Sequence, residues 1–243
     1  MKPLLQTIGL FKQFAGLRGF GPIDFYANPG ETVGIIGPNG SGKTTFFNVV
    51  TGFLKPTSGQ VLWQDQDITN LADYRRARLG LVRTFQEKMV FQGTSVRENL
   101  HFALIQHGKL SIGDLELTEV LAYVGLPNST IDQKAGDLSW GQSRLLGMAL
   151  SLVMKPRLML LDEPFAGLNR VSSLKITNML QSLKKDGIGI VIVEHEMSLL
   201  LPLCDRVVVF ADGQVLAEGS NHEILQRNDV RKAYFGEEIV ARD

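Results

Sequence analysis

The segment GPNGSGKTT, residues 37–45, decides the fold of this chain. It has the spacing G-x-x-x-x-G-K-T, follows an apolar run typical of a buried strand and precedes a run typical of a helix. Glycines in such a loop let backbone N–H groups turn inward onto phosphate, and the lysine adds positive charge beside the β- and γ-phosphates. The segment therefore predicts an α/β fold with a nucleotide at the start of a helix. The candidate nucleotide-binding residues are Gly37, Pro38, Asn39, Gly40, Ser41, Gly42, Lys43, Thr44 and Thr45.

The sequence around this loop predicts alternating strands and helices. Short apolar runs separated by turns fill residues 1–36, a helical run follows at 44–54, and 58–68 has the pattern of a hairpin. Residues 87–153 have helical periodicity and predict an insert. Strand-like runs return at 157–164, 187–195 and 206–219, separated by helical stretches at 168–186 and 196–203. This order predicts a parallel or mixed sheet with covering helices.

Length and composition describe an ordinary globular chain. Its 243 residues include 25 Lys+Arg and 25 Asp+Glu, and the zero net charge provides no overall field for nucleic acid or anionic lipid. The single cysteine, Cys204, excludes an internal disulfide, and we expect it to be a buried small residue in a reducing compartment. No run reaches the roughly 18 apolar residues of a membrane span, and the N-terminal run is too short for a secretory signal. These features predict a cytoplasmic protein without a nucleic-acid partner.

Two adjacent acids follow the apolar run in RLMLLDEP, residues 157–164. A buried strand delivers Asp162 to a magnesium shell at its carboxyl end, where the Thr44 hydroxyl is a second candidate ligand. Glu163, one residue further, points elsewhere and is a candidate general base that takes a proton from water.

Two more polar residues lie at predicted junctions. His195, in VIVEHEM, follows another apolar strand, and a parallel sheet brings such strand ends to one rim, so we predict a contact with the γ-phosphate. Gln86, in VRTFQE, lies where the core passes into the helical insert. Its amide is a further candidate magnesium ligand that reports the metal to the insert.

The segment LSWGQ, residues 138–142, predicts a second helix start that suits an anion. Packing alone does not explain a serine and a glycine at this position, so we expect Ser139, Gly141 and Gln142 to face phosphate. One nucleotide does not obviously need two helix starts, and the sequence alone leaves open which nucleotide this one contacts.

These motifs resemble, over essentially the whole chain, those of the ATP-binding subunit of an ABC transporter. By this resemblance, residues 37–45 are the Walker A loop, Gln86 is the Q-loop, LSWGQ is the signature, and LMLLDEP (158–164) is the Walker B strand. AGLN (166–169) is the D-loop, His195 is the switch histidine, and Phe14 falls where an aromatic residue stacks on adenine, with core packing as its alternative role.

The resemblance implies one cassette over residues 1–243. Its P-loop NTPase core, 1–86 and 154–243, holds a mixed or parallel sheet and an N-terminal antiparallel β region, and its helical subdomain is 87–153. It also implies ATP and Mg²⁺, a second ATPase chain whose bound ATP contacts Ser139, Gly141 and Gln142, and Glu163, His195 and Gln86 as catalytic residues. Transmembrane permease subunits dock near 86–92, so the chain is peripheral on the inner face of the membrane.

Finer features point to a subfamily. VRTFQ, AGLN, VEHEM and the tail RNDVRKAYFGEE (227–238) resemble the ATPases of importers of branched-chain amino acids, amides and urea, which work with a substrate-binding protein. The alternatives are the ATPase of a lipid or lipopolysaccharide exporter and a soluble ABC ATPase that acts on nucleic acid or ribosomes. The signature helix departs from the family at Trp140, Gly147 and Leu150. We expect this helix to keep its anion binding, but the sequence leaves open how it packs.

Overall fold

The computed structural model describes residues 2–16, 19–84, 90–106, 108 and 113–235. Within these residues, six strands form a mixed sheet in the order β10-β9-β3-β8-β7-β6. The strands are β3 (Thr32–Ile36), β6 (Leu81–Thr84), β7 (Leu158–Asp162), β8 (Gly189–Val193), β9 (Arg206–Ala211) and β10 (Gln214–Gly219). Neighbours are parallel except for the β9–β10 hairpin. The predicted fold class is therefore confirmed.

The N-terminal region forms a separate antiparallel sheet, as predicted. In the described part of the chain its order is β2-β1-β4-β5, with β1 (Leu5–Lys12), β2 (Phe20–Ala27), β4 (Ser58–Trp63) and β5 (Gln66–Asp67). The β4–β5 turn holds Gln64 and Asp65 at φ 50° and 66°, the left-handed conformation that matches the twist of a two-residue hairpin. Phe20, Phe25, Phe46 and Phe210 pack between this sheet and the larger one.

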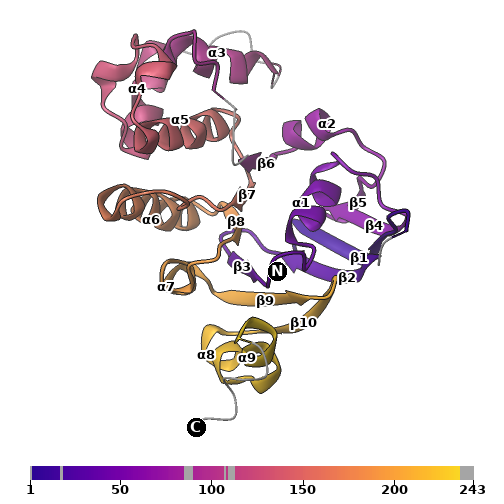
Figure 1. Cartoon of the computed structure of the whole chain (residues 1–243). Helices are drawn as coiled ribbons and strands as arrows, with labels where there is room; N and C mark the ends of the chain where they lie inside the picture. The colour runs from indigo at the N-terminus through magenta and orange to yellow at the C-terminus, as the bar shows by residue number, and fades with distance from the viewer. Residues whose placement is uncertain (1, 17–18, 85–89, 107, 109–112, 236–243) are drawn as a thin grey trace.

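Most helices lie around the larger sheet, while the antiparallel sheet lies at one side of the molecule (Figure 1). Helix α1 (Lys43–Thr51) follows the glycine loop and ends at Gly52, whose φ of 87° suits a residue without a side chain. The helices of the predicted insert are α3 (Val96–Gln106), α4 (Asp114–Val124) and α5 (Trp140–Val153), with short 3-10 turns η1 (Asn128–Thr130) and η2 (Ala135–Asp137). The remaining helices are α2 (Asp73–Arg78), α6 (Arg170–Lys185), α7 (Met197–Leu200), η3 (Leu201–Leu203), α8 (Asn221–Gln226) and α9 (Asn228–Phe235).

Helices α3, α4 and α5 form a group beyond the β6 edge of the larger sheet, while α8 and α9 lie at the opposite end, next to β10 (Figure 1). Helix α5 packs against both α3 and α4, and its buried Leu146 and Ala149 belong to an apolar cluster that continues to α6 and the sheet. Among the described residues, no helix is both long and apolar enough to cross a membrane.

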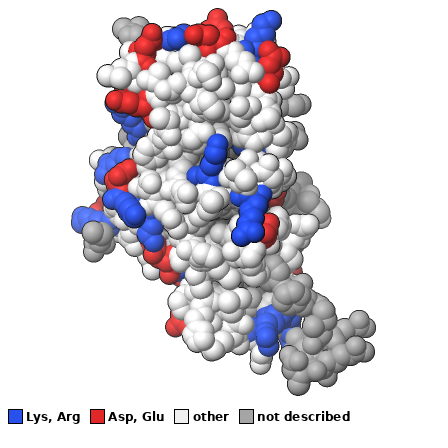
Figure 2. Space-filling view, turned by 90° about the vertical axis from the view of Figure 1, so that its left-hand side faces the viewer, with Lys and Arg blue, Asp and Glu red and all other residues white. Residues whose placement is uncertain are grey.

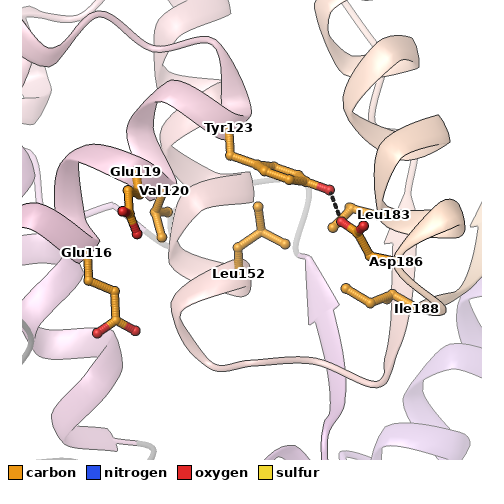
Figure 3. Close-up of a pocket in the computed structure, with 8 residues that line it drawn as sticks. All are labelled: Glu116, Glu119, Val120, Tyr123, Leu152, Leu183, Asp186 and Ile188. Atoms are coloured by element: carbon orange, nitrogen blue, oxygen red, sulfur yellow. Dashed lines mark hydrogen bonds between the residues drawn. The ribbon is translucent and has the colours of Figure 1, made fainter.

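The insert also meets the end of α6, where a cavity of about 240 Å³ opens between α4, α5, α6 and β8 (Figure 3). Its floor is apolar and includes Val120, Leu152 and Ile188. The Tyr123 hydroxyl on α4 donates to Asp186 Oδ2 at 2.8 Å, beside this cavity. The cavity is thus a junction between insert and core, away from the glycine loop.

The side of the molecule on the left of Figure 1 carries charges of both signs. Figure 2 shows acidic and basic side chains intermixed there, around wide areas of other residues. On this face, therefore, acidic and basic side chains lie near one another instead of forming two separate patches.

Candidate nucleotide site

The carboxyl ends of three neighbouring strands bring the predicted polar residues to one edge of the sheet. The register pairs Ile35 of β3 with Val193 of β8, and Val193 with Asp162 of β7. The glycine loop leaves the end of β3, while Glu194 and His195 leave the end of β8. Such an edge is where open α/β sheets bind their ligands.

The side chain of Lys43 folds back onto the glycine loop. Lys43 Nζ donates to the carbonyl oxygens of Gly37 at 2.6 Å and Pro38 at 3.0 Å. Burial lowers the pKa of Lys43, although the carboxylates of Glu163 and Asp162 oppose this shift. A partly desolvated ammonium in a loop is a strong partner for an anion.

Two residues of the loop, Ser41 and Gly42, have features that suit a bound phosphate. The Ser41 hydroxyl is buried and has no hydrogen-bond partner among the described residues. A buried polar group without a partner is costly, and a phosphate oxygen would satisfy it. Gly42 has φ 104°, and a Cβ there would lie 2.3 Å from the Phe20 ring, so only glycine fits this turn. The loop therefore fits the phosphates of a nucleotide.

Asp162 is held by an arginine that the sequence analysis did not single out. Arg83 Nη2 lies 2.8 Å from Asp162 Oδ2, and the exposed fraction of each side chain is 6%. Thr44, by contrast, is exposed at the start of α1. A carboxylate and a hydroxyl are the hard oxygen donors that Mg²⁺ prefers, so these residues fit that ion by chemistry.

Glu163 and His195 lie in contact. His195 Nε2 is 3.1 Å from Glu163 Oε1, and both side chains are partly exposed. The backbone of Glu163 has φ 48°, a left-handed conformation that is rare for a residue with a side chain. Such strain is concentrated at functional sites, and here it occurs at the residue whose carboxylate contacts His195.

Glu194 is a further site residue that the sequence analysis missed. Its carboxylate is buried and accepts hydrogen bonds from the backbone N–H groups of Phe165 at 2.8 Å and His195 at 3.1 Å. Burial raises the pKa of Glu194, against the effect of these N–H donors. The residue joins the turn after β7 to the turn after β8. An acid directly after the apolar run of β8 was the signal available in the sequence.

The helix start at LSWGQ has an internal explanation, which corrects the expectation that packing does not call for its residues. The Ser139 hydroxyl accepts from the Gln142 backbone N–H, while the Gln142 side chain accepts from the Ser139 N–H, and together they form a capping box. A Cβ on Gly141 would lie 2.7 Å from the hydroxyl of Ser172 on α6. Capping and close packing thus account for both residues without a ligand.

Two of the three departures in the signature helix, Trp140 and Leu150, make contacts that explain them. Trp140 is exposed, and its indole N–H points to the carbonyl oxygen of Ala166 at 3.5 Å, which links this helix start to residues 166–169. Leu150 is buried in the apolar cluster of the insert, where it packs instead of making an ion pair. Gly147 faces open space. The packing of this helix is therefore intact.

Phe14 has its described contacts in the apolar core. Phe14 is partly buried and packs against the apolar cluster between the two sheets, and Lys12 Nζ lies 5.9 Å from its ring centroid. Its role at adenine stays a prediction. Gln86 lies outside the described residues, as do Glu87, Lys88 and Met89.

Comparisons with known proteins agree with this geometry. Residues 20–166 match the family model described as ABC transporter. The chain is 37% identical to the lipopolysaccharide export system ATP-binding protein LptB of Acidithiobacillus ferridurans, over 98% of this chain and 99% of that protein. It is 35% identical to the high-affinity branched-chain amino acid transport ATP-binding protein LivG of Escherichia coli K12, over 97% of this chain and 99% of that protein.

Solved structures include a close match. The crystal structure of the ADP conformation of MJ1267, an ATP-binding cassette of an ABC transporter, superposes with a TM-score of 0.88 at 32% identity, covering 98% of this chain and 100% of that one. The chain therefore belongs to the ABC transporter family, as an ATP-hydrolysing cassette.

Proposed function

We propose that this chain is the ATP-hydrolysing subunit of a transporter, and that paired with a second ATPase chain it drives separate transmembrane permease subunits. The observation that carries the proposal is the meeting of the glycine loop, Asp162, Glu163 and His195 at one sheet edge. The similarity to transport ATPases over nearly the whole chain supports it. By this proposal the chain is peripheral on the inner face of the membrane.

Nucleotide binding is assigned to the loop and its surroundings. The N–H groups of residues 40–45 and the Lys43 ammonium hold the β- and γ-phosphates, and the Ser41 hydroxyl gains the partner it lacks. Phe14 stacks on the adenine. Thr44, Asp162 and Gln86 hold Mg²⁺, which when bound neutralises charge on the phosphates.

Hydrolysis is assigned to Glu163 and His195. The Glu163 carboxylate accepts a proton from the attacking water, since it is ionisable, partly exposed and next to the phosphate loop. His195 orients this carboxylate through the 3.1 Å contact and reaches the γ-phosphate. Gln86 is the third proposed catalytic residue. Its amide binds the metal and reports its presence to the helical insert.

The signature helix is assigned to the ATP held by the other chain. The capping box occupies the backbone N–H groups of Ser139 and Gln142. A helix start leaves four N–H groups without partners in the helix, so the N–H groups near Gly141 remain for a γ-phosphate. Loss of the γ-phosphate removes these contacts and lets the pair of chains open. ATP is then shared between two chains arranged head to tail.

The solute is proposed from the relatives. Import of branched-chain amino acids or related small solutes, with a substrate-binding protein, follows from the likeness to LivG and from the motifs VRTFQ, AGLN and VEHEM. The likeness to LptB favours lipopolysaccharide export as a second candidate.

Transport assays in cells of the source organism that lack this chain test the proposal. Wild type, but not Lys43→Ala, is expected to restore uptake of radiolabelled leucine. Normal uptake together with lost surface lipopolysaccharide would support the exporter. If both are normal and the chain co-purifies with ribosomes or DNA, the transport role is wrong.

The surface around Phe91, which belongs to the predicted docking segment 86–92, is a proposed docking site for the permease. Phe91 and Phe102 are exposed, with ring centroids 5.1 Å apart, and Ile105 on the same helix as Phe102 is 58% exposed. The possibility that Phe91 is a core residue is excluded by its exposed fraction of 57%. Val90, in contrast, packs partly against the core of the insert.

Phe91→Ala is therefore expected to lower transport by roughly tenfold, the effect of losing one aromatic anchor at an interface. The ATPase activity and the melting temperature of the isolated chain should stay unchanged, because Phe91 supports little of the core. Leu115→Ala, a change at a 74% exposed residue on α4, is the matched control and should leave transport intact. Unfolding of the Phe91 variant, or unchanged transport, would contradict the docking site.

A further inference from the structure

Arg83 connects elements that lie far apart in the sequence. It lies on β6, and its guanidinium donates to Asn48 Oδ1 on α1 at 2.6 Å and to Asp162 Oδ2 at the end of β7 at 2.8 Å. Its guanidinium also lies over the Phe47 ring, 5.4 Å from the centroid. Arg83 is only 8% exposed, so the guanidinium is fixed inside the molecule.

The pair has an electrostatic consequence for Asp162. A buried carboxylate needs an opposite charge, and the Arg83 guanidinium supplies one. Lys43 lies close enough to interact electrostatically with both Asp162 and Glu163. The Asp162 carboxylate therefore lies within reach of two cations, Arg83 and Lys43.

A divalent cation bound at Asp162 would be repelled by these two cations. It must share one carboxylate with a guanidinium that is anchored at its other end by Asn48 and cannot move aside freely. Repulsion between like charges a few ångströms apart is strong in a buried site. The triphosphate of ATP brings enough negative charge to outweigh that repulsion.

We propose that Arg83 is a built-in counter-ion that prevents Asp162 from binding Mg²⁺ by itself, so that the metal is held only together with ATP. This inference rests on the proposed role of Asp162 as a metal ligand. Arg83 thereby couples metal binding to nucleotide binding, and Asn48 holds it in place.

Direct metal titration tests this inference. Mn²⁺, a spectroscopic substitute for Mg²⁺, is titrated into the nucleotide-free chain, and bound ion is measured by electron paramagnetic resonance. Arg83→Met keeps an unbranched apolar stem but removes the charged guanidinium, and is expected to tighten Mn²⁺ binding by about tenfold or more. The double variant Arg83→Met/Asp162→Asn should return to the weak binding of the wild type.

Matched controls separate this effect from general changes in charge. Arg157→Met removes an exposed arginine just before the other end of β7, where its guanidinium donates to Gln64, and should leave Mn²⁺ affinity unchanged. Mn²⁺ should raise the melting temperature of Arg83→Met more than that of the wild type, because a ligand stabilises the state it binds. Unchanged Mn²⁺ affinity in a folded Arg83→Met chain would overturn the inference.

Asn48→Ala covers the case in which Arg83→Met does not fold. It releases one anchor of the guanidinium without leaving a buried charge unpaired, and is expected to tighten Mn²⁺ binding by a smaller factor. No change in this variant would overturn the inference when the other cannot be measured. Binding of ATP with Mg²⁺ to the wild type is measured in parallel: its absence counts against the proposed function, whereas its presence without the Arg83 effect counts against this inference alone.

Discussion

Replacing Glu163 by glutamine is expected to lower ATP hydrolysis by roughly 10²- to 10⁴-fold, or about 3–5 kcal/mol of activation free energy. Glutamine keeps the shape of the side chain and can keep the 3.1 Å contact with His195, but it cannot accept the proton of the attacking water. ATP affinity should persist, because the loop and Lys43 are untouched.

Turnover of ATP under saturating conditions measures this effect, with nucleotide affinity determined separately. Glu196→Gln is the control, since Glu196 is an exposed acid next to His195 whose carboxylate accepts from Ser198. It should retain wild-type turnover. Near-normal hydrolysis by Glu163→Gln would show that another group is the base.

Lys43→Ala is expected to behave differently from Glu163→Gln. The ammonium interacts with phosphate both before and during the reaction, so its removal weakens nucleotide binding itself. Equilibrium binding of a fluorescent ATP analogue distinguishes the two variants. Unchanged affinity in Lys43→Ala would contradict the phosphate contact of this lysine.

The strands that carry the site were predictable because continuous apolar runs of this length are typical of buried strands. The apolar runs of β3, β7 and β8 are buried on both faces, which a parallel sheet between helices requires. Asp162 and His195 follow such runs directly, and the topology of a parallel sheet then brings them to the same edge.

Strand β6 was not predictable from the same signals. It is short, and it buries Arg83 and Thr84 where a core strand normally carries apolar residues. Asn48 and Asp162, which are distant in the sequence, are among the partners that stabilise Arg83 there. Helix α2 also escaped prediction; its buried Arg76 donates to the backbone carbonyls of Val49 and Val50. A pattern of apolar residues cannot reveal partners of this kind.

The signature helix shows a second limit of prediction from the sequence. The spacing from Ser139 to Gln142 is that of a capping box, so the sequence held a structural explanation for the serine beside the functional one. The close approach of Gly141 to Ser172 depends on how α5 meets α6, which no local pattern specifies. A role in binding ATP on another chain therefore has to be tested on the chain itself.

Ser139→Arg is expected to lower hydrolysis by roughly 10²-fold or more, while the single chain still binds ATP almost normally. A bulky cation at this helix start blocks the approach of the second chain and so keeps the N–H groups near Gly141 from the γ-phosphate. Loss of the cap alone costs only about 1 kcal/mol of stability. Ser139→Ala loses the same cap without the bulk, and as the control it should be affected far less. Equal losses in both variants would assign the effect to capping.

The shared site is tested most directly by mixing two inactive chains, Ser139→Arg and Lys43→Ala, and measuring ATP hydrolysis across a series of ratios. In a head-to-tail pair, the mixed dimer places both changes in one site, because the loop of one chain faces the signature helix of the other, and the second site is left intact. Activity should therefore rise above that of either variant and reach its maximum near equal amounts. Activity that follows a straight line between the two pure variants at every ratio would contradict a site built from two chains.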